Sequence, residues 1–361
     1  MLGYFKRFVD NFSKKYNVKN SEKYIDLIHY DAEGKIFESK YILKDIIGKS
    51  NYEVYQCISK NNKNNCTKEY ACKVIKYTEQ ESQINVEKSE ECFKKYFREI
   101  YPLSCKKKYI VKIYEIFIGQ QEMKIIMEKC DTNLQIYIDK YLVQNQYNPK
   151  MIDLLKICLQ ISKAIKFLKE KGLAHRDIKP ENILVKQQKQ ELQIKLTDFG
   201  LSKEPQKKDN QYTQNQTLCG TAGYQSPEIH QEIEYNPFKN DIYSLGSTFF
   251  SIFSKINCIV IKQLEKNQIS DVDELNSQTD SRIQSSILKQ IRNNLLKKQK
   301  DIKADFDISE LLQGQFQQTN IKNYYEICEL TNEMLSFYQD KRPTIEKVVD
   351  RLQHQIKGET E

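Results

Sequence analysis

The sequence contains no apolar run long enough to cross a lipid bilayer. Its most apolar stretch, STFFSIFSKINCIVI from Ser247, is interrupted by Lys255 and Asn257 and falls short of the ~20 apolar residues that a membrane-spanning helix needs. No signal peptide is visible at the N-terminus. These absences predict a protein without a transmembrane segment, located in the cytoplasm, with the nucleus as the alternative.

The ten cysteines do not include a single CxxC pair. Zinc sites and disulfide frameworks depend on regularly spaced cysteines, so neither is expected, and reduced thiols are the simplest interpretation. A strong charge bias is also lacking, because 57 Lys and Arg against 49 Asp and Glu leave a net charge of +8. An excess this small in 361 residues favours a solvated surface, so no nucleic-acid partner is predicted.

What the sequence does contain is a change of pattern near Cys130. Before it, the pattern is strand-like over residues 40–77, 109–118 and 123–128, with a helical stretch at about 90–103. After it, helical patterns dominate, beginning with MIDLLKICLQISKAIKFLKEKG, which ends at Gly172. The chain is therefore predicted to have an α+β fold, with a small antiparallel β lobe and a larger, mainly helical lobe. The expected boundaries are 36–129 for the first lobe, 130–356 for the second and 357–361 for a tail.

Two further segments stand apart from these lobes. Residues 1–35 form an N-terminal extension whose first 20 residues place aromatic and aliphatic side chains at helical spacing, with lysines and an arginine between them. Such a basic amphipathic helix can contact an anionic membrane, but docking on its own protein is the favoured interpretation. Residues 256–320 are rich in Gln, Asn, Lys, Asp and Ser and are predicted to be an insertion that is partly helical.

The most informative stretch is HRDIKPENILV, residues 175–185, followed closely by LTDFGLSK, residues 196–203. Phosphoryl transfer requires a carboxylate beside the attacking hydroxyl, a cation on the transferred phosphate and oxygen ligands for magnesium. The two motifs supply this set as Asp177, Lys179, Asn182 and Asp198.

Both motifs match the eukaryotic protein kinase family, and the sequence resembles its serine/threonine type. The resemblance implies a bilobal kinase fold, ATP and Mg as cofactors, and transfer of the γ-phosphate to Ser or Thr of protein substrates. Asp177 would accept the hydroxyl proton and Lys179 would neutralise the γ-phosphate. Asn182 and Asp198 would hold magnesium. An upstream kinase is an expected partner.

The resemblance also assigns a nucleotide site. Lys73, in YACKVI, would contact the α- and β-phosphates and pair with Glu99 on the following helix. Met127 would lie beside the adenine pocket, at the hinge between the lobes. The other expected nucleotide contacts, made by backbone groups or apolar side chains, are Gly48, Val54, Ala71, Glu128, Cys130 and Leu184.

Residues expected to act in control and in stability lie further along the chain. Arg176 would bind a phosphate on the activation loop, for which Thr217 is the first candidate acceptor and Thr213 and Tyr212 are alternatives. Thr221 is expected to be a structural contact of Asp177 and Lys179. Glu228, in CGTAGYQSPE, would form a structural ion pair with Arg342, in KRPT.

The resemblance weakens at two places. GKSNYEVY is one residue shorter than the glycine-rich phosphate loop of the family and keeps only Gly48, with Tyr52 near the place of the third glycine. Pro102 follows Glu99 closely and is expected to end or kink the helix there. These departures predict weaker ATP binding or slower turnover. They also leave a second hypothesis, a catalytically weak pseudokinase that acts as a scaffold or allosteric partner.

Overall fold

The computed structural model describes most of the two predicted lobes. The described residues are 27–31, 33–49, 52–60, 68–77, 108–140, 151–188, 191–208, 211–213, 219–230, 234–268 and 321–360. The chain divides into two compact units, residues 1–131 with 197–200, and residues 132–196 with 201–361. The first contains an antiparallel-rich sheet and the second is mainly helical, which confirms the predicted α+β protein-kinase fold. The helix expected at 90–103, with Glu99 and Pro102, lies outside the described residues.

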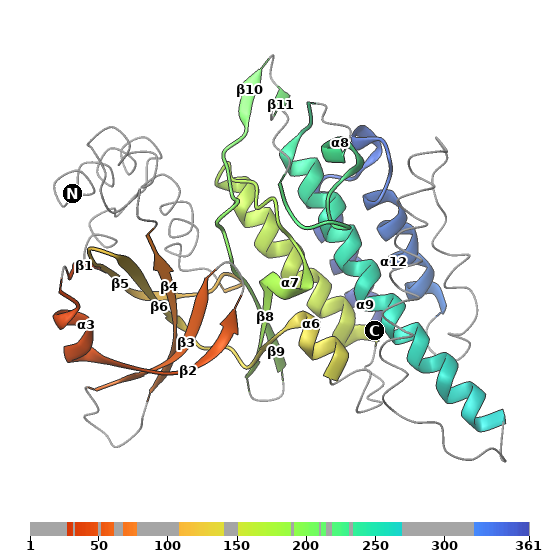
Figure 1. Ribbon diagram of the computed structural model, residues 1–361. Helices are drawn as coiled ribbons and strands as arrows, with labels where there is room; N and C mark the ends of the chain where they lie inside the picture. The colour runs from red at the N-terminus through yellow and green to blue at the C-terminus, as the bar shows by residue number, and fades with distance from the viewer. Residues whose placement is uncertain are drawn as a thin grey trace. The chain divides into compact units, whose positions relative to one another are not determined.

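The first unit is built on a six-stranded sheet in the order β1-β5-β6-β4-β3-β2 (Figure 1). Neighbouring strands are antiparallel except for β1 and β5, which are parallel. The strands are β1 (Ile28–Tyr30), β2 (Tyr41–Lys49), β3 (Glu53–Ser59), β4 (Glu69–Lys76), β5 (Ile113–Ile118) and β6 (Glu122–Glu128).

The sheet begins earlier than the lobe start predicted at residue 36. β1 (Ile28–Tyr30) was expected to belong to the N-terminal extension, but it pairs with β5. A strand of three residues is too short to show an alternating pattern, so the sequence could not reveal it. A short helix, α3 (Lys35–Lys40), follows, and the Asp31 carboxylate accepts hydrogen bonds from the backbone N–H groups of Ile36 and Phe37 at 2.9 and 2.6 Å. A carboxylate at this end compensates the unpaired helical N–H groups.

One face of the sheet carries an aromatic core. Phe37 of α3 packs on Tyr41 and Phe117, and Tyr41 packs on Tyr70. The same cluster contains buried Cys57, Cys72, Val74 and Ile126. Side chains alternate along a strand, so the residues between these core positions point to the opposite face. Gly48, Val54, Ala71 and Lys73 share that opposite face, because Gly48 pairs with Val54 and Val54 pairs with Lys73.

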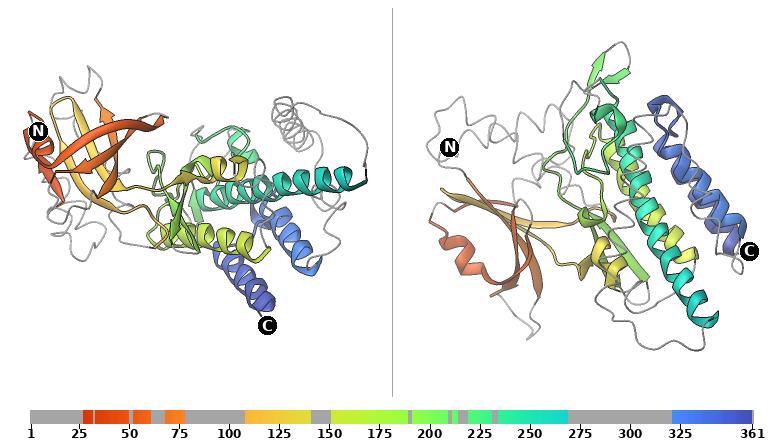
Figure 2. Two further views of the ribbon diagram at one scale, coloured as in Figure 1. Left: turned by 90° about the horizontal axis from the view of Figure 1, so that it is seen from below. Right: turned by 45° about the vertical axis from the view of Figure 1, so that its right-hand side comes forward.

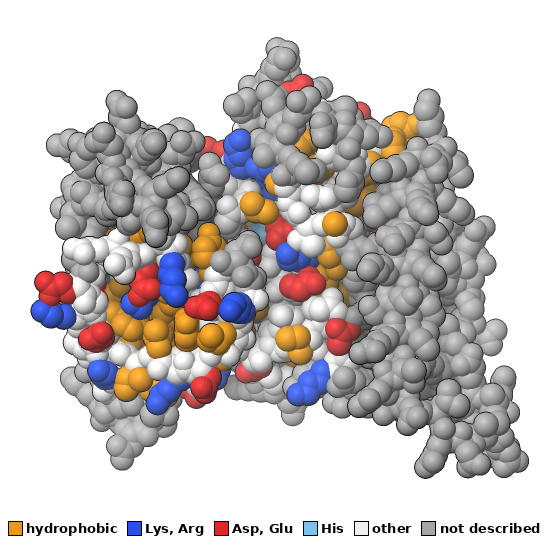
Figure 3. All heavy atoms as spheres, in the orientation of Figure 1, with side chains coloured by type: hydrophobic (Ala, Val, Ile, Leu, Met, Phe, Trp, Pro, Cys, Tyr) orange, Lys and Arg blue, Asp and Glu red, His pale blue; other side chains and the backbone are white. Residues whose placement is uncertain are grey.

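β2 is one of the two edge strands of the described sheet. It carries three exposed isoleucines, Ile42, Ile46 and Ile47, and Figure 3 shows hydrophobic side chains bordered by lysines and acids on this unit. Its register with β3 shifts twice, between Leu43 and Ile46 and again between Ile46 and Gly48. Bulges and flanking charges of this kind protect an edge strand from pairing with another chain.

The second unit surrounds helix α7 (Met151–Glu170). α7 lies beside α13 (Ile345–Thr360) and α9 (Pro237–Gln268), and α9 lies beside α12 (Ile321–Met334) (Figures 1 and 2). The remaining helices are α6 (Leu134–Tyr137), α8 (Pro227–His230) and the short η2 (Pro180–Asn182) and η3 (Gln339–Lys341). The strands of this unit are β7 (Thr132–Asn133), β8 (Ile183–Gln188), β9 (Glu191–Leu196), β10 (Gln206–Lys208) and β11 (Gln211–Thr213). No helix in the described ranges is long and apolar enough to span a membrane.

α7 ends where the sequence predicts. Gly172 has a left-handed φ of 71°, its N–H donates to the carbonyl of Lys169 at 2.8 Å, and the N–H of Leu173 donates to Leu168 at 2.9 Å. This Schellman arrangement turns the chain directly into the HRD motif. By contrast, α9 continues to Gln268 and so covers the first part of the segment predicted as an insertion at 256–320. The rest of that segment lies outside the described residues.

One buried side chain in α13 is poorly matched to its surroundings. Gln355 is only 3% exposed, and neither polar atom of its amide has a hydrogen-bond partner within the described structure. An unsatisfied buried polar group costs about 1 to 3 kcal/mol, and an apolar group of similar shape removes that cost.

We therefore expect Gln355→Met to raise the free energy of unfolding by about 1 to 3 kcal/mol in urea denaturation. Gln353 lies on the same helix and is exposed, so Gln353→Met is the matched control and should change stability by less than about 0.5 kcal/mol. Equal effects of the two substitutions, or a loss of stability in Gln355→Met, would contradict the assignment of an unsatisfied amide.

Candidate active site

The HRD motif is held by a buried carboxylate on α9. Asp241 is 1% exposed, and its two oxygens accept hydrogen bonds from the backbone N–H groups of His175 and Arg176, both at 2.8 Å. Arg176 has a left-handed φ of 70°, a strained conformation for a non-glycine residue that persists only when its surroundings enforce it. The two bonds to Asp241 supply that constraint.

Burial raises the pKa of Asp241 to about 7, while the two backbone N–H groups and the charge of Arg176 act in the opposite direction. A buried ionised carboxylate is costly unless donors compensate it. The loop and Asp241 therefore depend on each other, since the loop supplies the donors and the carboxylate sets the path of the loop.

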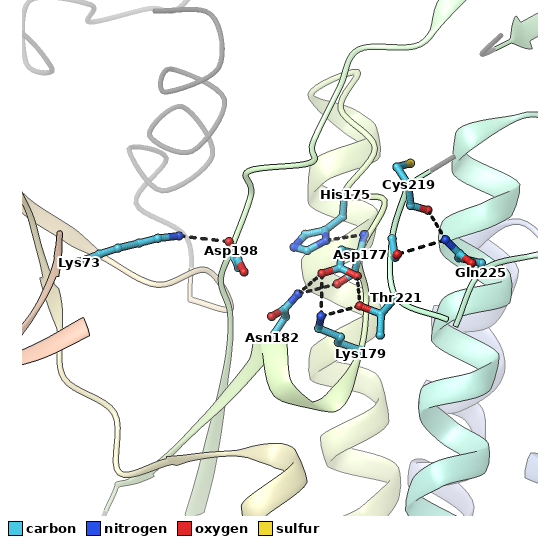
Figure 4. A network of polar contacts seen from close by, with 10 residues as sticks. Lys73, His175, Asp177, Lys179, Asn182, Asp198, Cys219, Thr221 and Gln225 are labelled. Atoms are coloured by element: carbon cyan, nitrogen blue, oxygen red, sulfur yellow. Dashed lines mark hydrogen bonds and ion pairs between the residues drawn. The ribbon is translucent and has the colours of Figure 1, made fainter. Parts of the chain in front are cut away.

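Three polar side chains contact the carboxylate of Asp177, the residue that follows Arg176 (Figure 4). Asp177 Oδ1 accepts a hydrogen bond from Thr221 Oγ1 at 2.8 Å, and Oδ2 lies 3.0 Å from Lys179 Nζ and 2.9 Å from Asn182 Nδ2. Lys179 Nζ also donates to Thr221 Oγ1 at 2.6 Å. Burial alone would raise the pKa of Asp177, but the hydrogen bonds from Thr221 and Lys179 outweigh it and lower that pKa. The carboxylate is therefore ionised and able to accept a proton.

Asn182 is oriented by the same carboxylate. It ends the short helix η2, and its Nδ2 donates both to the backbone carbonyl of Asp177 at 2.8 Å and to Asp177 Oδ2. With the amide nitrogen used in this way, the remaining oxygen, Oδ1, is the atom that could bind a cation. The donor chemistry of this residue fits the magnesium ligand that the sequence suggests.

The first unit contains a separate charged pair. Lys73 Nζ lies 3.1 Å from Asp198 Oδ1, and Lys73 is only 5% exposed. Asp198 has a left-handed φ of 62°, so its backbone is strained in the same way as that of Arg176. The partner expected for Lys73 was Glu99, which lies outside the described residues, so that pair stays a prediction. Contact with Asp198 was not anticipated, because 125 residues separate the two in sequence.

Among the described residues, no group of three or more His, Cys, Asp or Glu could hold a metal by itself. This agrees with the chemistry of magnesium, which is usually bound by one or two protein oxygens together with water and substrate phosphates. Asn182 in the second unit and Asp198 in the first each carry an oxygen of the kind that magnesium binds, and the expectation that they hold it together stays a prediction.

The residues expected around adenine are divided between the units. Gly48, Val54 and Ala71 share one sheet face, whereas Leu184 lies on β8 in the second unit. Met127 is buried near the end of β6, and Cys130 is half-buried just after it.

Glu128, the last residue of β6, is tied to the neighbouring chain segment. Its N–H donates to the carbonyl of Lys112 at 2.9 Å, and its Oε1 accepts from the N–H of Lys112 at 2.8 Å. These paired contacts fix the backbone at the expected hinge. The side chain of Glu128 therefore has a structural partner that sequence reasoning did not supply.

The activation segment contains a hairpin of β10 (Gln206–Lys208) and β11 (Gln211–Thr213), in which Thr213 pairs with Gln206. Thr217 lies outside the described residues. Arg176, expected to bind a phosphate, donates from Nη2 to Cys219 Sγ at 2.6 Å. The sequence did not reveal this contact of Cys219, because 43 residues separate Cys219 from Arg176.

Glu228 and Arg342 are brought together. Arg342 Nη2 lies 2.6 Å from Glu228 Oε1, and Arg342 Nε donates to the carbonyl of Ser336 at 2.8 Å. Both side chains are almost fully buried, at 4% and 2% exposure. Removing one partner of such a pair would leave an uncompensated buried charge, so the contact joins the end of the activation segment to the last helical section.

Comparison of the sequence with known proteins identifies a family and several relatives. The sequence matches the protein kinase domain over residues 41–354. It is 44% identical over 97 residues to the serine/threonine-protein kinase chk-2 of Caenorhabditis elegans, which covers 26% of this chain and 19% of that protein. It is 34% identical over 137 residues to the human calcium/calmodulin-dependent protein kinase type IV, covering 38% of this chain and 27% of that protein. The matched region is 7% of a third relative, the probable serine/threonine-protein kinase gdt2 of Dictyostelium discoideum.

A site built from a carboxylate, a lysine and an asparagine on an α+β scaffold is typical of phosphotransfer enzymes. The domain match extends over most of the sequence, and this chain belongs to the protein kinase family. The relatives that it matches are serine/threonine kinases, and the chain spans well under two thirds of their length.

The lowered pKa of Asp177 depends on the Thr221 hydroxyl. We expect Thr221→Val to raise the pKa of Asp177, because the valine keeps the shape and removes the donor while burial still disfavours the charged form. Carboxyl ¹³C chemical shifts of selectively labelled aspartate, followed against pH, measure this directly. Thr221→Ser keeps the hydroxyl and is the matched control. An Asp177 pKa that is the same in all three proteins would show that the hydroxyl does not stabilise the carboxylate.

Proposed function

We propose that this protein is an active, ATP-dependent serine/threonine kinase that transfers the γ-phosphate of Mg-ATP to hydroxyl groups of protein substrates. The observation that carries the proposal is the Asp177 carboxylate, kept ionised by Thr221 and Lys179 and oriented beside Asn182. A purely structural loop would not need a carboxylate with a lowered pKa beside a lysine whose side chain is only 19% exposed.

In the proposed reaction, the substrate hydroxyl oxygen forms a bond to the γ-phosphorus, and the bond from that phosphorus to the ADP oxygen breaks. Asp177 accepts the hydroxyl proton, and Lys179 balances the negative charge of the transferred group. Lys73 binds the α- and β-phosphates. Asn182 and Asp198 would hold magnesium, which would supply positive charge to screen the phosphates.

We further propose control by phosphorylation of the activation segment, at Thr217 or Thr213. Arg176 supports this proposal, because it is buried and its Nε has no hydrogen-bond partner in the described part of the chain. An arginine N–H in this situation is stabilised by an anionic oxygen, and a phosphate supplies one.

The test is transfer of labelled phosphate from Mg-ATP to a generic basic protein substrate. Asp177→Asn should lower the rate by about 10² to 10⁴-fold, because it removes the proton acceptor while its amide keeps the shape of the side chain. Asp350, an exposed acid on α13, provides the matched control, and Asp350→Asn should keep the activity of the unmodified protein. Thermal unfolding of both variants checks that the fold is intact.

A signal from the unmodified protein that does not exceed that of Asp177→Asn would remove the enzyme proposal. The chain would then be a pseudokinase, with a scaffold or allosteric role, which is the alternative that the shortened glycine loop favours. Full activity in Asp177→Asn would instead mean that transfer occurs without the residue assigned as proton acceptor.

A further inference from the structure

We propose that Tyr52 caps the Lys73 ammonium and must leave it before nucleotide phosphates can bind there. The aromatic ring of Tyr52 faces the ammonium, with 4.7 Å between Nζ and the ring centroid. Tyr52, Lys73 and Asp198 all belong to the first unit. The inference rests on the proposed function, because it concerns the residue assigned to the α- and β-phosphates.

The register of the strands explains how Tyr52 reaches this position. Lys49 of β2 pairs with Glu53 of β3, so Tyr52 lies directly before the first paired residue of β3. Val54, two residues further along, pairs directly with Lys73 on β4. This register brings Tyr52 close to Lys73, and its ring lies over the Lys73 ammonium.

The local chemistry makes this contact favourable. Lys73 is nearly buried, and a buried ammonium needs compensation for its lost hydration. The negative face of an aromatic ring supplies part of it, and Asp198 Oδ1 at 3.1 Å supplies another part. A nucleotide phosphate would offer the ammonium a stronger partner, but the ring first has to move from the side that it covers.

A glycine at this place could not form such a cap. At the retained glycine of the loop, Gly48, a Cβ would lie 3.6 and 3.9 Å from atoms of the Val54 side chain. Neither crowding by the described residues nor a positive φ therefore requires glycine at residue 48. The loop residue that affects Lys73 is Tyr52, whose ring faces the ammonium.

The contact predicts that removing the ring strengthens nucleotide binding. Tyr52→Leu keeps apolar bulk but has no π face, and we expect it to lower the Kd for Mg-ATP by about 2- to 30-fold, the range of measured cation–π contacts. Tyr52→Phe keeps the ring and is the matched control, with a Kd within about twofold of the original protein. Isothermal titration calorimetry on the full chain measures all three values.

Adenosine separates the cap from a general change in the loop. It lacks phosphates and does not need the Lys73 ammonium, so its affinity should be the same in the original protein and in Tyr52→Leu. A tighter Kd for Mg-ATP with an unchanged Kd for adenosine supports the cap. A Kd for Mg-ATP that is unchanged or weaker in Tyr52→Leu overturns it, as does equal tightening for both ligands.

The outcomes also distinguish this inference from the proposed function. Equal Mg-ATP binding by the original protein and Tyr52→Leu would leave the kinase proposal standing and remove the cap. Binding by Tyr52→Leu alone would support a cap strong enough to hold the site closed. Failure of every variant to bind Mg-ATP would overturn both the nucleotide site and the cap that depends on it.

Discussion

The buried carboxylate of Asp241 is the constraint on which the candidate site depends. It holds the backbone N–H groups of His175 and Arg176 and keeps Arg176 in a left-handed conformation. The backbone conformation of Arg176 sets the direction in which the chain continues into the next residue, Asp177. The loop stabilises the buried carboxylate by supplying two hydrogen-bond donors, and the carboxylate on α9 in turn fixes the backbone of the loop.

Compensated buried charge is the common feature of the second unit. Asp177 is balanced by Lys179 and Thr221, and the Glu228 carboxylate by Arg342. Each group would be costly alone. Lys179 is a local partner of Asp177, whereas Thr221 and Arg342 come from distant parts of the chain. In the first unit, the Lys73 ammonium contacts the Asp198 carboxylate and the Tyr52 ring, and we propose that the ring competes with the ligand.

Much of this arrangement could be predicted from the sequence, because short motifs carry their own chemistry. Asp177, Lys179 and Asn182 lie within six residues, so local geometry brings them together whatever the rest of the chain does. The end of α7 was also predictable, since glycine relieves a left-handed backbone at Gly172. The alternation of apolar residues predicted the sheet, and the helical patterns after Cys130 predicted the second unit.

What could not be predicted depends on contacts between distant segments. The strand β1 is too short for periodicity, and the roles of Glu128 and Cys219 follow from neighbours that become adjacent only in the fold. The contact between Lys73 and Asp198, at 3.1 Å, illustrates the same limit, because 125 residues separate the two in sequence. In the sequence, Tyr52 is notable only because it lies near the place of the third glycine of the phosphate loop. Its proposed role as a cap on Lys73 follows from the contact between the Tyr52 ring and the Lys73 ammonium.

Native-state hydrogen exchange in the Asp241→Asn variant tests most directly whether Asp241 holds the HRD loop. Asparagine keeps one acceptor oxygen and places an N–H donor where the second oxygen was, so the bonds to His175 and Arg176 cannot both be made. We expect faster exchange of these two amides, with the amides of α7 as protected as before. Unchanged protection of His175 and Arg176 would contradict this role of Asp241.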